Sequence, residues 1–278
     1  MAAGRHTLPI GVFDSGIGGL TVLRSLMAAL PCETFIYVGD TARVPYGNRS
    51  EETIVRYARE ACGFLVRRGV KLIVLACNTV SAVASPLLKV DFDIPVIGVI
   101  ESTSQRATQR SRGGRIGVIG TRRTVSSGAY QRTITITDSR CEVLGAPAPL
   151  LVPLAEEGIT AGEMVSSALD LYLSELLDRG IDTLILGCTH YQLFVPAITS
   201  FIEVRLGAGI EVVDSSTCVA DAAREFLETR ELLAPPGPPA EPDICVTDDP
   251  ENFSLVGTRF FGSRLTSSIR LVSLTSNP

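Results

Sequence analysis

The chain has 278 residues, of which 45% are hydrophobic, and its formal net charge at pH 7 is −5. This length can bury one large core or two of medium size, and the negative charge argues against a general nucleic-acid-binding protein. The longest apolar runs, such as Leu72–Cys77, are too short to span a bilayer, and Met1–Pro9 lacks the apolar stretch of a signal peptide. We therefore expect a soluble cytoplasmic protein with no membrane partner.

The composition also limits the cofactors that we expect. The seven cysteines form no C-x-x-C pair, and the two histidines, His6 and His190, show no zinc-ligand spacing. Free thiols are therefore expected, and neither a disulfide framework nor a metal site is predicted. The chain has two lysines, Lys71 and Lys89, and neither is expected at the strand end where a pyridoxal phosphate would need a Schiff-base lysine. We expect no cofactor.

The first half of the chain alternates short apolar strands with helical segments. Asn48 or Ser50 can cap a helix, Glu51 completes a capping-box pattern with Asn48, and Gly69 is a typical helix stop. Such alternation predicts a parallel sheet covered by helices. The expected strands are Ile10–Phe13, Thr34–Val38, Leu72–Leu75 and Val96–Ile100.

The middle of the chain repeats this order of elements. A strand is expected at Ile116–Ile119, and Thr160 with Glu163 forms another capping-box pattern that opens a helix ending at Gly180. The apolar run Ile181–Leu186 follows. The arginines that lie between these elements and the first half, from 106 to 123, are interpreted as a solvated loop and helix face rather than a nucleic-acid patch.

The two halves can be aligned without a gap. Placing Cys77 on Cys188 also places Gly69 on Gly180, so helix stop, strand and cysteine coincide. Chance similarity of two strand–helix units is the alternative. We predict an α/β protein of two pseudo-symmetric parallel-sheet domains, with the active site in the cleft between them.

The remaining C-terminal segment is too short for a domain of its own. A helix is expected at Cys218–Arg230, a linker with five prolines at Leu233–Asp243, and strands at Ile244–Thr247 and Ile269–Leu274 around a helix near Phe253–Phe261. We expect it to pack back onto the first half. The predicted domains are 1–102 plus 217–278, which is discontinuous, and 103–216.

The two cysteines at equivalent strand ends suggest acid/base catalysis by a pair of thiols. Ligands of open α/β sheets bind at the carboxyl ends of the strands, so Cys77 and Cys188 would meet across one cleft. Racemisation needs an acid/base group on each side of one carbon, each able to act in both directions. A thiol has an ordinary pKa of about 8.5, and a following helix N-terminus lowers the pKa. We expect both cysteines to gain this effect.

Other polar residues lie close to these strand ends in the expected fold. Asp14 could hold or receive a proton beside Cys77, and His190, with Glu156, could do so beside Cys188. Each residue alone has a structural explanation, and only their joint placement favours the catalytic one. Neutral hydrogen bonds to a substrate carboxylate could come from Ser15, Asn78, Thr79, Thr121 and Thr189.

Several long motifs occur in one order over most of the chain, and with them the sequence resembles the glutamate racemases. These motifs are Gly11–Leu20, Tyr37–Asp40, Val44–Gly47, Ala76–Thr79, Ile116–Thr121, Val152–Glu156 and Gly187–Tyr191. The sequence departs from the family pattern at Gln192, where many members have proline, and at Ser216, where glycine is common. Neither departure removes an acid/base group.

The resemblance implies a cofactor-independent interconversion of L- and D-glutamate that supplies D-glutamate for peptidoglycan. It implies Cys77 and Cys188 as the two acid/base groups, Asp14 as the acid beside the first, and Glu156 with His190 as the pair assisting the second. It also implies a homodimer. The implied substrate contacts are Asp14, Ser15, Tyr46, Gly47, Asn78, Thr79, Thr121, Thr124, Thr189 and His190.

Three alternatives remain open at this point. The enzyme could racemise aspartate or another acid, although the motifs around the cysteines favour glutamate. A binding or regulatory protein could use the same two-lobed fold. A cysteine hydrolase would need one nucleophile and a base, for which Cys188 and His190 could serve, but two equivalent cysteines fit it poorly.

Overall fold

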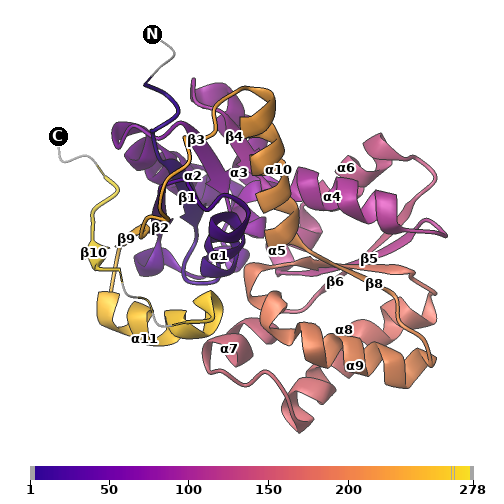
Figure 1. Cartoon of the computed structure of the whole chain (residues 1–278). Coiled ribbons are helices and arrows are strands. Elements are labelled where there is room, and N and C mark those ends of the chain that lie inside the picture. The colour runs from indigo at the N-terminus through magenta and orange to yellow at the C-terminus, as the bar shows by residue number, and fades with distance from the viewer. Residues whose placement is uncertain (1–3, 264, 266, 276–278) are drawn as a thin grey trace.

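The structure, a computed structural model that describes residues 4–263, 265 and 267–275, contains two parallel β-sheets (Figure 1). A six-stranded sheet has the order β10-β9-β2-β1-β3-β4, and a four-stranded sheet has the order β6-β5-β7-β8. The predicted α/β fold with two parallel sheets is confirmed. The strands are β1 (Ile10–Asp14), β2 (Phe35–Gly39), β3 (Leu72–Leu75), β4 (Val96–Gly98), β5 (Arg115–Gly120), β6 (Glu142–Pro147), β7 (Thr183–Gly187), β8 (Glu211–Asp214), β9 (Asp243–Val246) and β10 (Ile269–Leu271).

Helices follow most of the strands, as the βα alternation predicts. The α-helices are α1 (Leu20–Ala29), α2 (Glu51–Arg67), α3 (Asn78–Asp91), α4 (Val99–Arg110), α5 (Arg122–Ser126), α6 (Ala129–Thr137), α7 (Leu151–Glu156), α8 (Glu163–Asp178), α9 (Val195–Leu206), α10 (Ser215–Thr229) and α11 (Pro250–Phe261). Three short 3₁₀ helices are η1 (Thr41–Arg43), η2 (Tyr46–Asn48) and η3 (Thr189–Phe194).

Helix starts were harder to predict than helix ends. The Ser50 side chain accepts the N–H of Thr53, so Ser50 caps α2, and the capping box with Asn48 is wrong. Gly162 precedes α8, so the capping box that begins at Thr160 is also wrong. Both glycine stops are confirmed: Gly69 and Gly180 follow α2 and α8 with φ of +74° and +72°, values that glycine adopts without steric cost.

Two predicted strands are too long. The strand expected at Ile269–Leu274 ends at Leu271. The run Val96–Ile100 was expected to be a strand, but β4 ends at Gly98 and α4 begins at Val99. The N–H of Ile100 donates to the Ser81 hydroxyl on α3, at 3.3 Å, rather than to a neighbouring strand. Residues 101 and 102 therefore lie in the first turn of a helix and not at a strand end.

Each sheet is covered on both faces. Val12 of β1 packs in the same core as α1 and α10, whereas the next residue, Phe13, packs in the core of α2 and α3, as alternation along a strand requires. Leu186 of β7 faces α8 and α9, and Ile185 faces α4 and α6. The core cluster that contains Val12 also contains Leu186, so one apolar core connects the two sheets.

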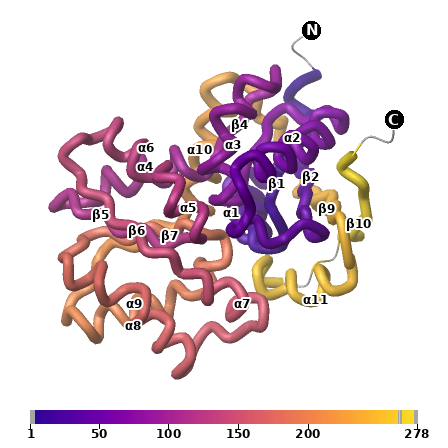
Figure 2. The backbone as a smooth tube through the Cα atoms, turned by 180° about the vertical axis from the view of Figure 1, so that it is seen from behind, coloured from indigo at the N-terminus to yellow at the C-terminus, as the bar shows by residue number. Residues whose placement is uncertain are grey.

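The C-terminal segment packs back onto the first sheet. Strand β9 pairs in parallel with β2, and β10 pairs with β9. Figure 2 shows this segment, in yellow, beside β2 and with α11 extending toward α7 of the other half. We propose the domain division 1–102 plus 217–278 and 103–216, which the membership of the strands in the two sheets supports. Within the described residues, no helix is long and apolar enough to cross a membrane.

Candidate active site

A cavity of about 240 Å³ lies at the carboxyl ends of the strands and takes its walls from both halves. Cys77 and Cys188 both line it. Of the predicted site residues, all except Asp14 and Thr124 lie on its wall. Those that do are Ser15, Tyr46, Gly47, Cys77, Asn78, Thr79, Thr121, Glu156, Cys188, Thr189 and His190.

Both cysteines occupy the position directly before a helix. Cys77 follows β3 and precedes α3, and Cys188 follows β7 and precedes η3. Their residues are only 6% and 7% exposed, and all seven cysteines of the chain are free. The pseudo-symmetry of the two halves therefore places two free thiols, nearly withdrawn from water, around one cavity.

The environment of Cys77 keeps its thiol protonated. Burial and the charge of Asp14 raise the pKa of Cys77 to about 12, although Ser15 and the N–H of Val80 act in the opposite direction. The thiol donates to the Ser15 hydroxyl, with 3.3 Å between sulfur and oxygen. The expected lowering of this pKa by the helix N-terminus is wrong, because the loss of hydration outweighs the helix dipole.

Asp14 lies behind the cavity wall at the end of β1 and is 1% exposed. One of its carboxylate oxygens accepts the N–H of Gly16 at 2.9 Å, and the other, Oδ1, has no hydrogen-bond partner among the described residues. Burial raises the pKa of Asp14. The glycine-rich turn after Asp14 allows close packing: a Cβ on Gly19 would lie 2.4 Å from the Asp14 Cβ, and one on Gly18 would lie 2.5 Å from Nδ1 of His190.

Cys188 has a cationic partner. The Cys188 sulfur lies 3.8 Å from Nδ1 of His190, and Nε2 of the same ring lies 3.0 Å from Oε1 of Glu156. Burial disfavours charge on the imidazole, but the hydrogen bonds to Cys188 and Glu156 outweigh this and raise the pKa of His190 to about 10. The ring of Phe260 packs edge-on against His190, with 5.0 Å between centroids. The imidazole is therefore held between the Cys188 sulfur, the Glu156 carboxylate and the Phe260 ring.

Hydroxyl groups gather where the two halves meet. The Thr79 hydroxyl lies 2.9 Å from that of Thr121 and 3.2 Å from that of Thr124, which is buried behind them. Thr124 therefore supports the two lining threonines and does not itself reach the cavity. Asn78 accepts a hydrogen bond from Tyr130 at 2.6 Å and donates one to Ser215 at 3.2 Å, so its amide orientation is held from two helices.

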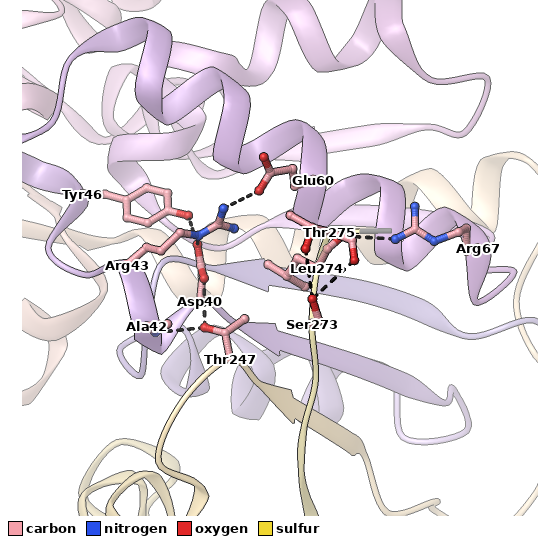
Figure 3. A network of polar contacts seen from close by, with 10 residues as sticks. All are labelled: Asp40, Ala42, Arg43, Tyr46, Glu60, Arg67, Thr247, Ser273, Leu274 and Thr275. Carbon is pink, nitrogen blue, oxygen red and sulfur yellow. Dashed lines mark hydrogen bonds and ion pairs between the residues drawn. The ribbon is translucent and has the colours of Figure 1, made fainter. Parts of the chain in front are cut away.

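A polar network fixes the loop that carries Tyr46 and Gly47 (Figure 3). The buried carboxylate of Asp40 accepts hydrogen bonds from Arg43, Tyr46 and Thr247. Thr247 follows β9, so the C-terminal segment helps to hold this wall. Gly47 is required here because a Cβ would lie 2.9 Å from the Thr121 Cβ in the opposite half.

Several lining residues were not among the predicted site residues. Arg122 is exposed and lines the cavity, although the sequence places it in the solvated arginine face. The lining prolines and apolar side chains carry no acid, base or hydrogen-bonding group, so the sequence gave no chemical reason to select them. The other missed lining residues are Gly16, Ile17, Val44, Pro45, Asn48, Pro149, Val152 and Pro153.

The two departures from the resembled family meet at one carboxylate outside the cavity lining. Gln192 donates to Oδ2 of Asp214 at 3.1 Å, and the Ser216 hydroxyl donates to the same oxygen at 2.5 Å. They therefore form one structural contact and leave the cavity wall unchanged. Across the described part of the chain, no group of three or more His, Cys, Asp or Glu residues could hold a metal ion.

The comparisons with known proteins all identify racemases. The sequence model of the Asp/Glu/hydantoin racemase family matches residues 10–223. The glutamate racemase of Geobacter metallireducens is 47% identical, over 92% of this chain and 93% of that protein. The crystal structure of Francisella tularensis glutamate racemase in complex with D-glutamate has 37% identity and a TM-score of 0.89, over 97% of this chain and 98% of the other. The Thermus thermophilus glutamate racemase structure in complex with β-chloro-D-alanine has 41% identity and a TM-score of 0.86, over 97% and 98%.

Proposed function

The chain belongs to the Asp/Glu/hydantoin racemase family, and from this membership we propose that it interconverts L- and D-glutamate by moving a proton between Cys77, Cys188 and the substrate α-carbon. The observation that carries the proposal is the placement of two free thiols from equivalent strand ends in one cavity. The activity is that of an isomerase, and its product D-glutamate supplies peptidoglycan synthesis.

The surroundings of the two thiols differ in charge. Burial and Asp14 favour a neutral thiol at Cys77, whereas the raised pKa of His190 favours an imidazolium 3.8 Å from the Cys188 sulfur. For one enantiomer, the Cys188 thiolate takes the α-proton and the electron pair stays on the α-carbon. The Cys77 thiol then gives its proton to the opposite face and becomes a thiolate. The other enantiomer uses the reverse protonation, so atoms and charge balance with no further reactant.

Neutral donors are well suited to holding the substrate carboxylates. Ser15, Thr79 and Thr189 line the cavity, and α3 begins at its wall, where the first N–H groups of a helix have no partner within that helix. Arg122 adds a positive charge.

The substrate can be tested with enantiopure acids. Circular dichroism of the purified protein with L-glutamate, D-glutamate, L-aspartate or D-aspartate should show racemisation of glutamate. Turnover of aspartate without turnover of glutamate would reject the substrate assignment and favour the aspartate alternative.

Solvent exchange separates a racemase from a binding protein. In D₂O, with no added cofactor, deuterium should enter the α-position of glutamate and appear in the enantiomer not supplied. Binding without exchange would contradict the proposal. A persistent acyl-enzyme in intact-mass spectra would instead support the cysteine hydrolase alternative.

We also propose that the protein is a cytoplasmic homodimer. The resemblance to the glutamate racemases supports both statements. Analytical ultracentrifugation at micromolar concentration should give the mass of two chains, and a monomer throughout the concentration series would reject the dimer.

A further inference from the structure

Helix α11 contacts the proposed acid/base machinery of the opposite half. It follows β9 of the six-stranded sheet, and it lies beside α7 in both views of the molecule (Figures 1 and 2). Two consecutive residues near its end, Arg259 and Phe260, contact Glu156 and His190. A helix of the half that contains the six-stranded sheet thus contacts both members of the pair that assists Cys188.

The first contact holds the backbone of Glu156. Nη1 of Arg259 donates to the Glu156 carbonyl oxygen. This carbonyl belongs to the last turn of α7, where carbonyls have no partner within the helix and where the helix dipole favours a cation. The guanidinium lies against Gly158, since a Cβ there would be 3.0 Å from Nε. Arg259 therefore fixes the end of the helix from which the Glu156 side chain extends to His190.

The second contact holds the imidazole itself. Phe260 is 0% exposed, and its ring meets that of His190 at an interplanar angle of 75°. Both ring nitrogens of His190 are already engaged, Nδ1 by the Cys188 sulfur and Nε2 by Glu156. Because Phe260 packs against the same ring, it limits rotation of the imidazole away from the sulfur.

We propose that α11 positions the Glu156–His190 pair for proton transfer at Cys188, with Arg259 and Phe260 as the positioning residues. The proposal rests on the proposed racemase function and adds an interaction across the cleft. The first half then contributes to the acid/base chemistry of the second: Cys77 works with Asp14 of its own half, while Cys188 depends on a helix of the other.

Rates alone cannot locate such an effect. Enantiomers have equal free energies in water, so kcat/KM must be equal in the two directions in every variant. Isotope effects can locate it, because the hydrogen on the substrate leaves in one step while the hydrogen delivered to the other face comes from a thiol that exchanges with solvent. Slower transfer at Cys188 must raise the deuterium effect for the enantiomer whose hydrogen Cys188 removes, and lower it for the other.

The experiment measures kcat/KM for [2-²H]- and unlabelled L- and D-glutamate with the full-length protein. Arg259→Gln and Phe260→Leu should each lower kcat/KM by about fivefold or more, as expected for one lost interaction. Their two isotope effects should move in opposite directions. Arg259→Lys, which keeps a donor, should restore most of the rate and the wild-type isotope effects. Arg259 is exposed, so its substitution tests the proposal even where Phe260→Leu impairs folding.

Two further variants serve as controls for the isotope effects. Leu255→Ala changes an exposed residue of the same helix that is 72% accessible, and it should leave rate and isotope effects as in the wild type. Asp14→Asn acts on the Cys77 side and should shift the two isotope effects in the opposite sense to Arg259→Gln.

The outcomes separate this proposal from the proposed function. Unchanged rates in Arg259→Gln, or lower rates with both isotope effects unchanged, would overturn the positioning role while leaving the racemase intact. The same shift in Leu255→Ala would also overturn it, because a general loosening of α11 would then be sufficient. If the wild-type protein neither racemises nor exchanges glutamate, the proposed function itself fails.

Discussion

The charge on His190 gives a prediction whose size follows from the structure. Glu156→Gln removes the carboxylate that lies 3.0 Å from Nε2 of the imidazole. At an effective dielectric constant of about 20, that separation gives a gross attraction of about 5 kcal/mol. The Glu156 side chain is 47% exposed, and solvent competes strongly at such sites. We therefore expect the pKa of His190 to fall from about 10 by about one to two units, or about 1.4 to 2.7 kcal/mol.

Histidine NMR can measure this directly. The chain has two histidines, His6 and His190, so a His6→Gln background leaves one signal from ¹³Cε1-labelled histidine. That signal should remain imidazolium through pH 8 in the wild type and titrate at lower pH in Glu156→Gln. A wild-type midpoint near the ordinary value of about 6.5, or the same midpoint in both proteins, would refute the electrostatic coupling.

The same coupling predicts a dependence of stability on pH. Because the pKa of His190 is raised on folding, its contribution is fully present below about pH 6.5 and is lost as the pH rises through about 10. In urea unfolding, the wild type should exceed Glu156→Gln by about 1.4 to 2.7 kcal/mol near pH 6. The difference should disappear above pH 10, and a constant difference across this range would contradict the argument.

Three further predictions concern the proposed bases and the first sheet. Cys77→Ala and Cys188→Ala should each lose at least about three orders of magnitude in turnover, roughly 4 kcal/mol of barrier; near-normal turnover of either variant would reject the two-base mechanism. Asp14→Asn should slow turnover less than either cysteine variant, and a harmless change would leave Asp14 with a structural role only. Lys71→Met should lower the free energy of unfolding by about 3–5 kcal/mol, because it leaves Glu33, 2.6 Å away in a buried pair, without its cation; a loss under about 1 kcal/mol in urea titration, the value typical of exposed pairs, would contradict it.

Local patterns in the sequence were enough to predict the fold class and the two cysteines. Apolar runs such as Leu72–Leu75 are short-range signals, because a buried parallel strand needs apolar residues on both faces, and this strand has the predicted bounds. Gly69 and Gly180 were also predictable because each ends a helix with its own backbone conformation. The equivalent spacing from these glycines to Cys77 and Cys188 then placed both thiols after corresponding strands.

The end of β4 and the start of α4 depended on a residue distant in the chain. The N–H of Ile100 finds the hydroxyl of Ser81, and no pattern near Ile100 contains that information. The cavity residues that the sequence did not reveal were missed for the same reason. Arg122 gave the same signal as the solvated arginines around it, and only the approach of the two halves brings it to the cavity.

The amino-acid sequence by itself determined that two related α/β units each carry a cysteine at a strand end, because periodicity, capping and composition act over a few residues. Only the tertiary structure decided the protonation of the groups around those cysteines. The pKa values of Cys77 and His190 depend on burial and on Asp14 and Glu156, and both effects arise when distant segments exclude water together. The contact of α11 with Glu156 and His190 exists for the same reason, since it joins residues about a hundred positions apart through packing that no local pattern records.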